Sequence, residues 1–237
     1  MTSSPAPDGE REIFRVPPAP PRGTRIPSLR SASQARARLV ADGDRHEMRV
    51  ESGLEYKAAQ ILLARRDVVD VQEQPAAVSY VDDAGQRHQH TFDFRATMRD
   101  GRRVFVEVKP EDIAERIGLN GLLGTIASQV PQGVADRVVH LGERVLTRDA
   151  VHDARLIRVV RRDRHRPAET AVAAIVDGMA GRMTVAEIVR VSGLGAQAFR
   201  SVVRAVDDGR LRVVCGRRIG YGASVVRAGS LADGGRS

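Results

Sequence analysis

The sequence contains no tryptophan, one cysteine, two lysines and few aromatic residues among its 237 positions. The single Cys215 excludes a disulfide framework and a cysteine-rich zinc site. The scarcity of aromatic rings argues against modules that bind RNA or single strands by stacking bases. No apolar run is long enough to span a membrane, and the first residues carry no signal pattern, so we expect no membrane association and a cytoplasmic location.

Positive charge is abundant, and arginine supplies nearly all of it. Thirty-eight basic residues against 30 acidic ones give a net charge of +8, which favours a polyanionic partner such as double-stranded DNA. Compositional drift toward arginine is the alternative explanation. Because 36 of the basic residues are arginine, Lys57 and Lys109 stand out as positions where an ammonium was kept in place of a guanidinium.

Proline content and apolar periodicity divide the chain into five parts. Residues 1–45 hold most of the prolines and show no apolar period, which is typical of a mobile segment. The sequence therefore predicts, in order, a disordered Pro/Arg-rich arm (1–45), an α/β domain (46–150), an Arg-rich linker (151–167), a small helical domain (168–227) and a disordered tail (228–237).

The first domain is expected to alternate helices and strands. Its pattern predicts a helix from Arg45 to about Arg66 and a second one from near Glu111, which glycines weaken in its second half. The expected strands are 68–71, 78–81, 86–98, 102–108 and 138–141, of which the third and fourth form a hairpin around Arg99-Asp100-Gly101.

The second domain carries three helical patterns followed by two short strand patterns. The helices are expected at Ala168–Met179, Thr184–Val191 and Gly195–Asp208, and the strands flank Gly216–Gly222. This order is typical of a winged helix-turn-helix with Gly195–Asp208 as its recognition helix. We therefore expect DNA contacts from arginines of that helix and of the Arg-rich run, namely Arg200, Arg204, Arg161 and Arg162.

The hairpin register decides which acidic side chains meet. If Arg99-Asp100-Gly101 is a three-residue loop, Met98 faces Arg102 and Asp93 faces Glu107. Directly opposed residues project from the same face of a sheet, so two carboxylates would lie side by side and repel each other.

A divalent cation would relieve that repulsion. Mg²⁺ binds to one or two carboxylates together with phosphate oxygens and water, and Mn²⁺ could take its place. Lys109 points to the same face as Glu107, where it could hold an attacking water or steady charge on a phosphate. The alternative is that Asp93 and Glu107 are ordinary polar residues on the wet face of a hairpin.

Further polar residues could support this site. Glu51 and Glu55 lie one helical turn apart, so either could reach a metal. Gln74, at a strand end, could hold the backbone or touch a phosphate, although such an amide is more often structural. His88 and His90 fall on the face opposite Asp93 if the alternation holds, which argues against a role as metal ligands.

Four short motifs, in this order and spacing, resemble the TnsA-type endonuclease subunit of heteromeric bacterial transposases. They are Glu51-Ser-Gly-Leu-Glu55, Val71-Gln-Glu-Gln74-Pro75, Thr91-Phe-Asp93-Phe94 and Val106-Glu-Val-Lys109-Pro110. The resemblance covers roughly residues 48–111. Phe92 stands where the wider superfamily commonly has proline, which is a departure from the pattern.

The resemblance implies a restriction-endonuclease-like domain with a central mixed sheet, followed by a small winged-helix domain. It implies catalytic roles for Glu55, Asp93, Glu107 and Lys109, and we expect the metal to be held by Glu55, Asp93, Glu107 and Val108. The implied activity is Mg²⁺-dependent cleavage of DNA at the 5′ ends of a mobile element. The implied partners are a DDE-type transposase subunit, which would cut and join the 3′ ends, and an AAA+ regulator.

Two other functions remain open at this point. A stand-alone restriction or repair endonuclease would use the same residues without a transposase. A DNA-binding regulator that does not cut would need no metal, and the intact set of Glu55, Asp93, Glu107 and Lys109 makes it the weaker alternative.

Overall fold

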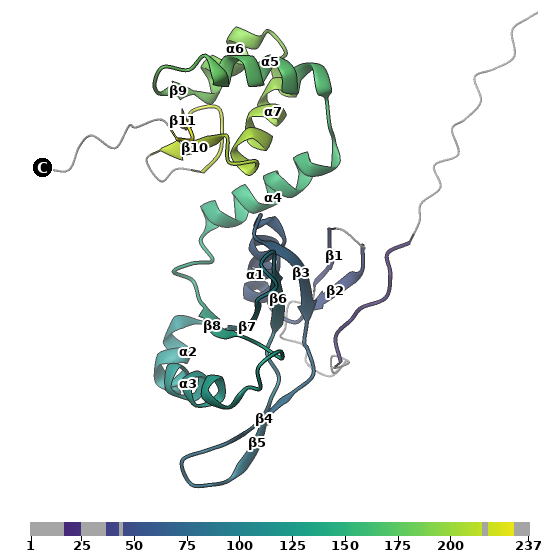
Figure 1. Ribbon diagram of the computed structural model, residues 1–237, viewed down its shortest axis with the longest axis vertical. Coiled ribbons are helices and arrows are strands. Elements are labelled where there is room, and N and C mark those ends of the chain that lie inside the picture. Colours follow the sequence, from purple (N-terminus) through teal and green to yellow (C-terminus); the bar gives the residue numbers. More distant parts are fainter. Residues whose placement is uncertain (1–16, 25–36, 43–44, 215–217, 230–237) are drawn as a thin grey trace, which may run out of the picture.

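The computed structural model describes residues 17–24, 37–42, 45–214 and 218–229. Within them an N-terminal body and a C-terminal body lie on either side of helix α4 (Figure 1). The N-terminal body contains β1 (Ala37–Val40), β2 (Glu47–Val50), α1 (Gly53–Ala64), β3 (Val68–Glu73), β4 (Val78–Val81), β5 (Arg87–His90), β6 (Phe94–Met98), β7 (Arg103–Val108), α2 (Glu111–Arg116), α3 (Leu119–Gln129) and β8 (Arg137–Leu141). The remaining elements are α4 (Arg148–Arg162), α5 (Arg166–Asp177), β9 (Met183–Thr184), α6 (Val185–Ser192), α7 (Gly195–Asp207), β10 (Leu211–Val214) and β11 (Ser224–Arg227).

A four-stranded mixed sheet forms the centre of the N-terminal body, in the order β3-β6-β7-β8. β6 is antiparallel to both β3 and β7, whereas β7 and β8 are parallel. The expected α/β architecture with a central mixed sheet is therefore confirmed.

The register of the β6–β7 hairpin is the predicted one. Phe94 pairs with Val106, and the amide of Met98 donates to the carbonyl of Arg102. Gly101 has φ of +87°, a left-handed conformation that L side chains rarely adopt. The turn thus fixes the register, and the register places Asp93, the residue just before β6, across from Glu107.

Both faces of the sheet are covered by apolar side chains. Val106 and Val108 belong to a core that α1 and the β1–β2 hairpin share and against which Val104 also packs, whereas Phe105, between Val104 and Val106, packs into a second core with α3. This alternation fits a strand that is buried on both sides. The sheet is therefore held rigidly between two layers, and its ends cannot slip in register without exposing one core.

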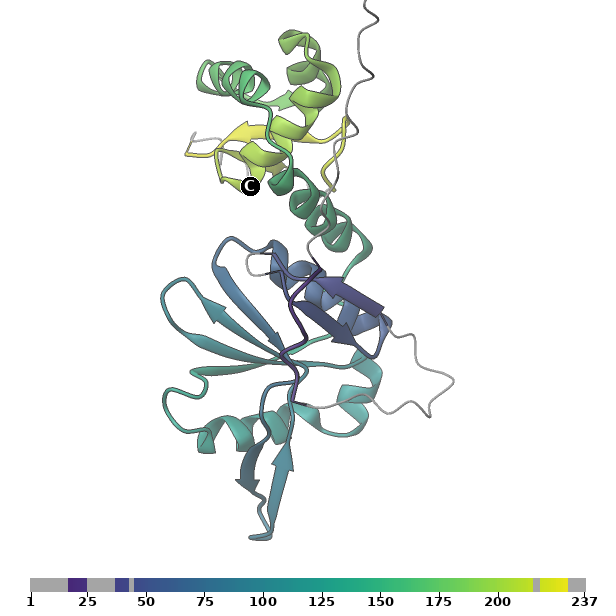
Figure 2. The same cartoon turned by 90° about the vertical axis from the view of Figure 1, so that its right-hand side faces the viewer.

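The β4–β5 hairpin projects from the sheet, away from the C-terminal body (Figures 1 and 2). The sequence pattern predicted one strand over 86–98. The structure divides it into β5, which pairs with β4, and β6, which pairs with β7 in the central sheet. The chain bends at Asp93, between these two strands.

Helix α1 starts later than predicted. It begins at Gly53, because the Ser52 side chain caps the amide of Glu55, and the residues before it form β2. The prediction of a helix from Arg45 is therefore wrong over 47–50, where Met48 and Val50 are buried strand residues.

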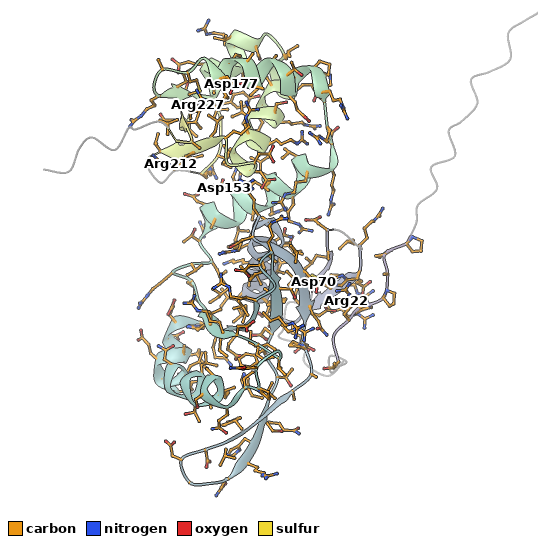
Figure 3. The ribbon with its side chains drawn as sticks, in the orientation of Figure 1. Arg22, Asp70, Asp153, Asp177, Arg212 and Arg227 are labelled. Carbon is orange, nitrogen blue, oxygen red and sulfur yellow. The ribbon has the colours of Figure 1, made fainter. Side chains whose placement is uncertain are left out.

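The prediction of a disordered arm over 1–45 is wrong for the parts that the structure describes. β1 pairs antiparallel with β2, and the amides of Arg22 and Gly23 both donate to Oε1 of Glu73. The Arg22 guanidinium lies 2.7 Å from Oδ1 of Asp70 (Figure 3). Proline-rich sequence here lies along the edge of β3, where its few amides find acceptors. The other arm residues, Cys215 and most of the predicted tail lie outside the described residues.

The predicted Arg-rich linker, 151–167, is helical over most of its length. Arginine is a good helix former, and Thr147 caps the first turn of α4 through the amide of Ala150. The segment predicted as a linker is therefore formed mainly by α4 and the start of α5. Helix α4 packs against α1 on one side and α7 on the other, so it connects the two bodies rigidly.

The C-terminal body combines three helices with a three-stranded sheet in the order β10-β11-β9. The capping box between Thr184 and Glu187 is confirmed. Helix α7 is the central element: Ala198 and Val202 face α5 and α6, whereas Val203 packs with Val160 of α4. This helix is therefore enclosed on several sides.

Arg204 of α7 should be a stability determinant. Its side chain is 9% exposed, and its guanidinium donates to Glu169 and to the carbonyls of Val160 and Asp163. Arg204→Met should lower the free energy of unfolding in urea by about 3–5 kcal/mol, because it leaves buried acceptors without a donor. Arg200→Met, which removes a half-exposed ion pair with Asp163, should cost less than about 1 kcal/mol. Equal small losses in both variants would contradict this account of α7.

Candidate active site

Four chain segments meet at one end of the central sheet. They are the N-terminal turn of α1 with Glu51 and Glu55, Gln74 after β3, Asp93 before β6, and the last residues of β7. The antiparallel pairing of β3 and β6, and of β6 and β7, brings the end of β3, the start of β6 and the end of β7 to the same edge. The local folding of each segment therefore places its polar side chain at a common edge.

Asp93 and Glu107 are the centre of this cluster. The carboxylate of Asp93 accepts a hydrogen bond of 2.6 Å from the amide of Val108, and Glu107 is only 5% exposed. Burial, and after it the charge of Glu107, raises the pKa of Asp93 from 3.8 to about 8, and Glu55 and Lys109 contribute smaller effects of opposite sign. Two carboxylates that repel each other in a protected position favour either a bound proton or a bound cation.

Glu55 belongs to the same electrostatic cluster. Burial raises its pKa, and the negative charges of Glu51 and Glu107 raise it further, although hydrogen bonds from the Glu51 amide and Ser52 act in the opposite direction. Its Oε2 accepts from the Glu51 amide at 2.8 Å. The carboxylates of Glu55, Asp93 and Glu107 therefore influence one another.

Lys109 provides the positive charge of the cluster. Its Nζ lies 3.3 Å from Oε1 of Glu107, and its side chain is 32% exposed. Its backbone is fixed to β8, because its amide donates to Leu141 and its carbonyl accepts from His140. The ammonium can therefore move at the surface of the site while its backbone stays in place.

Gln74 links three parts of the site through one residue. Its backbone N–H donates to the backbone carbonyl of Asp93 at 2.8 Å, and its backbone carbonyl accepts from the N–H of Thr24. Its side-chain Nε2 donates to Oε1 of Glu51 at 3.2 Å. Its φ of +39° is in the left-handed region, which a residue with a side chain occupies at a cost. Gln74 thus connects the backbone next to Asp93 with the side chain of Glu51.

The structure places His90 at the carboxylate cluster, whereas the sequence pattern placed it on the face opposite Asp93. Its Nε2 lies 3.0 Å from Oε2 of Glu107, inside the cluster. The prediction assumed one continuous strand whose side chains alternate between two faces. The strand is interrupted between His90 and the bend at Asp93, so this alternation does not hold across the two residues. His88, two residues earlier, pairs with Asp82 on the projecting hairpin. The sequence signal that could have indicated its position is that His90 directly precedes the motif that contains Asp93.

The donor chemistry of the cluster suits a hard divalent cation, because carboxylate and backbone carbonyl oxygens are the ligands such cations prefer. Among the described residues, however, no three acidic, histidine or cysteine side chains converge closely enough to hold a metal ion. Glu55 is turned to the Glu51 amide, and Glu107 to His90 and Lys109. Binding of a cation would require Glu55 to turn from the Glu51 amide and Oε1 of Glu107 to exchange its contact with Lys109 for one with the ion.

The four arginines predicted to contact DNA are engaged within the protein. Arg204 is buried, and Arg161 donates to Asp207 and to carbonyls at the end of α1. Arg200 pairs with Asp163, and Arg162 pairs with Asp42 while its side chain stays 59% exposed. The buried position of Arg204 does not suit a residue that reads a DNA groove.

Residues 65–144 match the family model of the TnsA-like endonuclease N-terminal domain. This part of the chain is similar to TnsA-like endonucleases. The match contains Gln74, Asp93, Glu107 and Lys109, and it confirms the resemblance drawn from the four motifs, although Glu55 lies before its first residue. A search of curated proteins gave no match. In the part of the chain that the structure describes, no helix has the length and apolar character needed to cross a membrane.

The raised pKa of Asp93 predicts a pH dependence of stability. The carboxyl ionises near pH 3.8 when unfolded and near pH 8 in the folded, metal-free protein, so between these values the unfolded state binds fewer protons. In EDTA the free energy of unfolding should therefore fall as pH rises through this window, by up to about 1.4 kcal/mol per unit. Asp93→Asn should remove this fall.

The comparison is made by urea unfolding at several pH values, with Asp83→Asn in the exposed β4–β5 turn as the control that should follow the wild type. Parallel pH profiles for wild type and Asp93→Asn would contradict the strong coupling of Asp93 to its buried surroundings.

Proposed function

We propose that this TnsA-like protein is the metal-dependent DNA endonuclease subunit of a heteromeric transposase, which hydrolyses phosphodiester bonds at the 5′ ends of a mobile element. The observation that carries the proposal is the buried approach of Asp93 and Glu107, with Lys109 beside them, inside the region that matches the endonuclease family. Mg²⁺ is the cofactor we propose, and Mn²⁺ could replace it.

The cation would be held by the carboxylates of Glu55, Asp93 and Glu107 and by the carbonyl of Val108. When bound, such an ion stabilises charge on a phosphoryl group and lowers the pKa of water. Asp93 would have to release its proton, which the positive charge favours. The Val108 amide keeps Asp93 oriented toward β7 in either state.

Lys109 is the residue we propose for handling charge or a proton at the reacting phosphate. Its ammonium is compact, partly exposed and held 3.3 Å from Glu107, so it can reach outward to DNA while staying near the carboxylates. A guanidinium would keep the charge but would be planar, larger and effectively never deprotonated.

We interpret the C-terminal body as a winged helix, because its elements follow the order helix, strand, two helices and two strands, with β11 between β9 and β10. Its α7 would be the groove-reading helix, but α4 packs against it through Val160 and Val203. We therefore place DNA contacts elsewhere. Arg45, Arg155 and Arg162 are exposed and line hollows between the β1–β2 hairpin and α4, which suits phosphate contacts.

The partners we propose are double-stranded DNA, a DDE-type transposase subunit and an AAA+ regulator. The alternative function is a stand-alone restriction or repair endonuclease, which would cut DNA without a transposase and without transposon ends. Cleavage that requires both the transposase and the element's ends would separate the two functions.

Lys109→Arg tests the proposed chemistry. It should leave folding and DNA affinity unchanged but lower the single-turnover rate of 5′-strand cleavage about a hundredfold or more, because the guanidinium cannot take the place of a small ammonium. The substrate is a plasmid that carries the element's ends, incubated with Mg²⁺, the protein and its transposase partner.

Lys57→Arg is the matched control, since Lys57 lies on α1 outside the cluster and is the one other lysine of the chain. Its rate should stay within about twofold of wild type, as is usual for substitutions away from a site. Equal activity of the two variants would contradict the role of Lys109 and with it the proposed nuclease mechanism.

A further inference from the structure

We propose that His90 is a positioning residue of the nuclease site, which holds Glu107 in the orientation needed to bind the cation. The proposal rests on the proposed function, since it concerns the same carboxylate cluster. It adds a residue that lies on the projecting β4–β5 hairpin and outside the four expected catalytic positions.

The two oxygens of Glu107 have different partners. Oε2 lies 3.0 Å from Nε2 of His90, and Oε1 lies 3.3 Å from Nζ of Lys109. The side chains of His90 and Glu107 are 19% and 6% exposed, so water competes little for this contact. A carboxylate held through one oxygen by a fixed donor keeps its second oxygen directed toward the site.

The imidazole of His90 is itself fixed by a short aromatic stack. Its ring meets Phe92 edge-on, with centroids 4.6 Å apart at 74°, and Phe92 stacks on Phe105 at 4.5 Å and 9°. Both phenylalanines are 1% exposed. Phe105 precedes Glu107 by two residues on β7, so the donor and the acceptor are both tied to the same strand.

This arrangement resembles the outer partners that orient metal-binding carboxylates and histidines in general. Groups hydrogen-bonded to a ligand fix its direction, and their loss typically costs about 10–100-fold in metal affinity or activity. Gln74 and Lys109 also approach the cluster, but of the contacts described here only His90 donates to Oε2 of Glu107 from a rigid ring.

His88 offers a matched control two residues away. It sits on the same strand β5 and pairs with Asp82 at 2.7 Å, but its side chain is 40% exposed and it lies outside the cluster. Replacement of His88 therefore shows the effect of losing a histidine–carboxylate pair elsewhere in the hairpin, and replacement of His90 shows the effect of losing the pair at the site.

The test compares His90→Leu, His90→Gln and His88→Leu in the full-length protein. Two quantities are measured: Mn²⁺ affinity by calorimetric titration, and the single-turnover rate of Mg²⁺-dependent cleavage at saturating DNA with the transposase partner. His90→Leu should weaken Mn²⁺ binding and slow cleavage, each by about 10–100-fold, with unchanged DNA affinity. His90→Gln, whose amide can donate to Oε2, should recover most of both losses, and His88→Leu should match wild type.

The variant Glu107→Gln completes a double-mutant cycle. If His90 acts through Glu107, His90→Leu should have little further effect on Mn²⁺ affinity once Glu107 is replaced. Wild-type behaviour of His90→Leu, equal losses in His90→Leu and His90→Gln, or additive effects in the cycle would each overturn the positioning role. A wild-type protein that neither binds Mn²⁺ nor cuts DNA would instead overturn the proposed function and this proposal with it.

Discussion

The placement of Asp93 opposite Glu107 across the β6–β7 hairpin is the constraint on which the site depends. The turn at Gly101 sets the register, and apolar layers on both faces of the sheet prevent it from slipping. Two carboxylates are thereby held in a protected position that raises the pKa of Asp93 to about 8. Two ionised carboxylates in this position would raise the free energy of the metal-free fold. Binding of a cation or a proton removes that repulsion, which favours its binding here.

The arginine excess has a second consequence besides attraction to DNA. Several guanidinium groups join elements inside the protein: Arg158 donates to Asp42, Gln60 and the Val40 carbonyl, and Arg161 connects the end of α1 with Asp207 of α7. A guanidinium has five donors in a rigid fork, so it can satisfy carbonyls and carboxylates from two elements at once. Net charge therefore overstates how many arginines are available to bind phosphate.

The sequence predicted the register of the β6–β7 hairpin better than the packing around it. The Asp93–Glu107 pairing follows from a local turn and strand alternation, which are properties of adjacent residues. The contact of His90 with Glu107 depends on a bend that interrupts the alternation, and no local pattern reports that bend. The docking of residues 17–24 on β3 and the enclosure of α7 by α4 arise from packing between distant segments, which overrides composition. The proline-rich arm was therefore interpreted as disordered although residues 17–24 and 37–42 are ordered, and the arginine-rich run was interpreted as a linker although it is helical.

The position of the proposed cation tests the central claim most directly. Crystals of the protein grown with Mn²⁺ would reveal the ion by its anomalous scattering at the manganese edge. The account predicts a single strong peak in contact with oxygens of Asp93 and Glu107 and with the Val108 carbonyl, with Oε1 of Glu107 turned from Lys109 to the ion and Oε2 still on His90. No peak at this cluster at saturating Mn²⁺, with Glu107 still held by both His90 and Lys109, would contradict the claim that these carboxylates form a metal-dependent nuclease site.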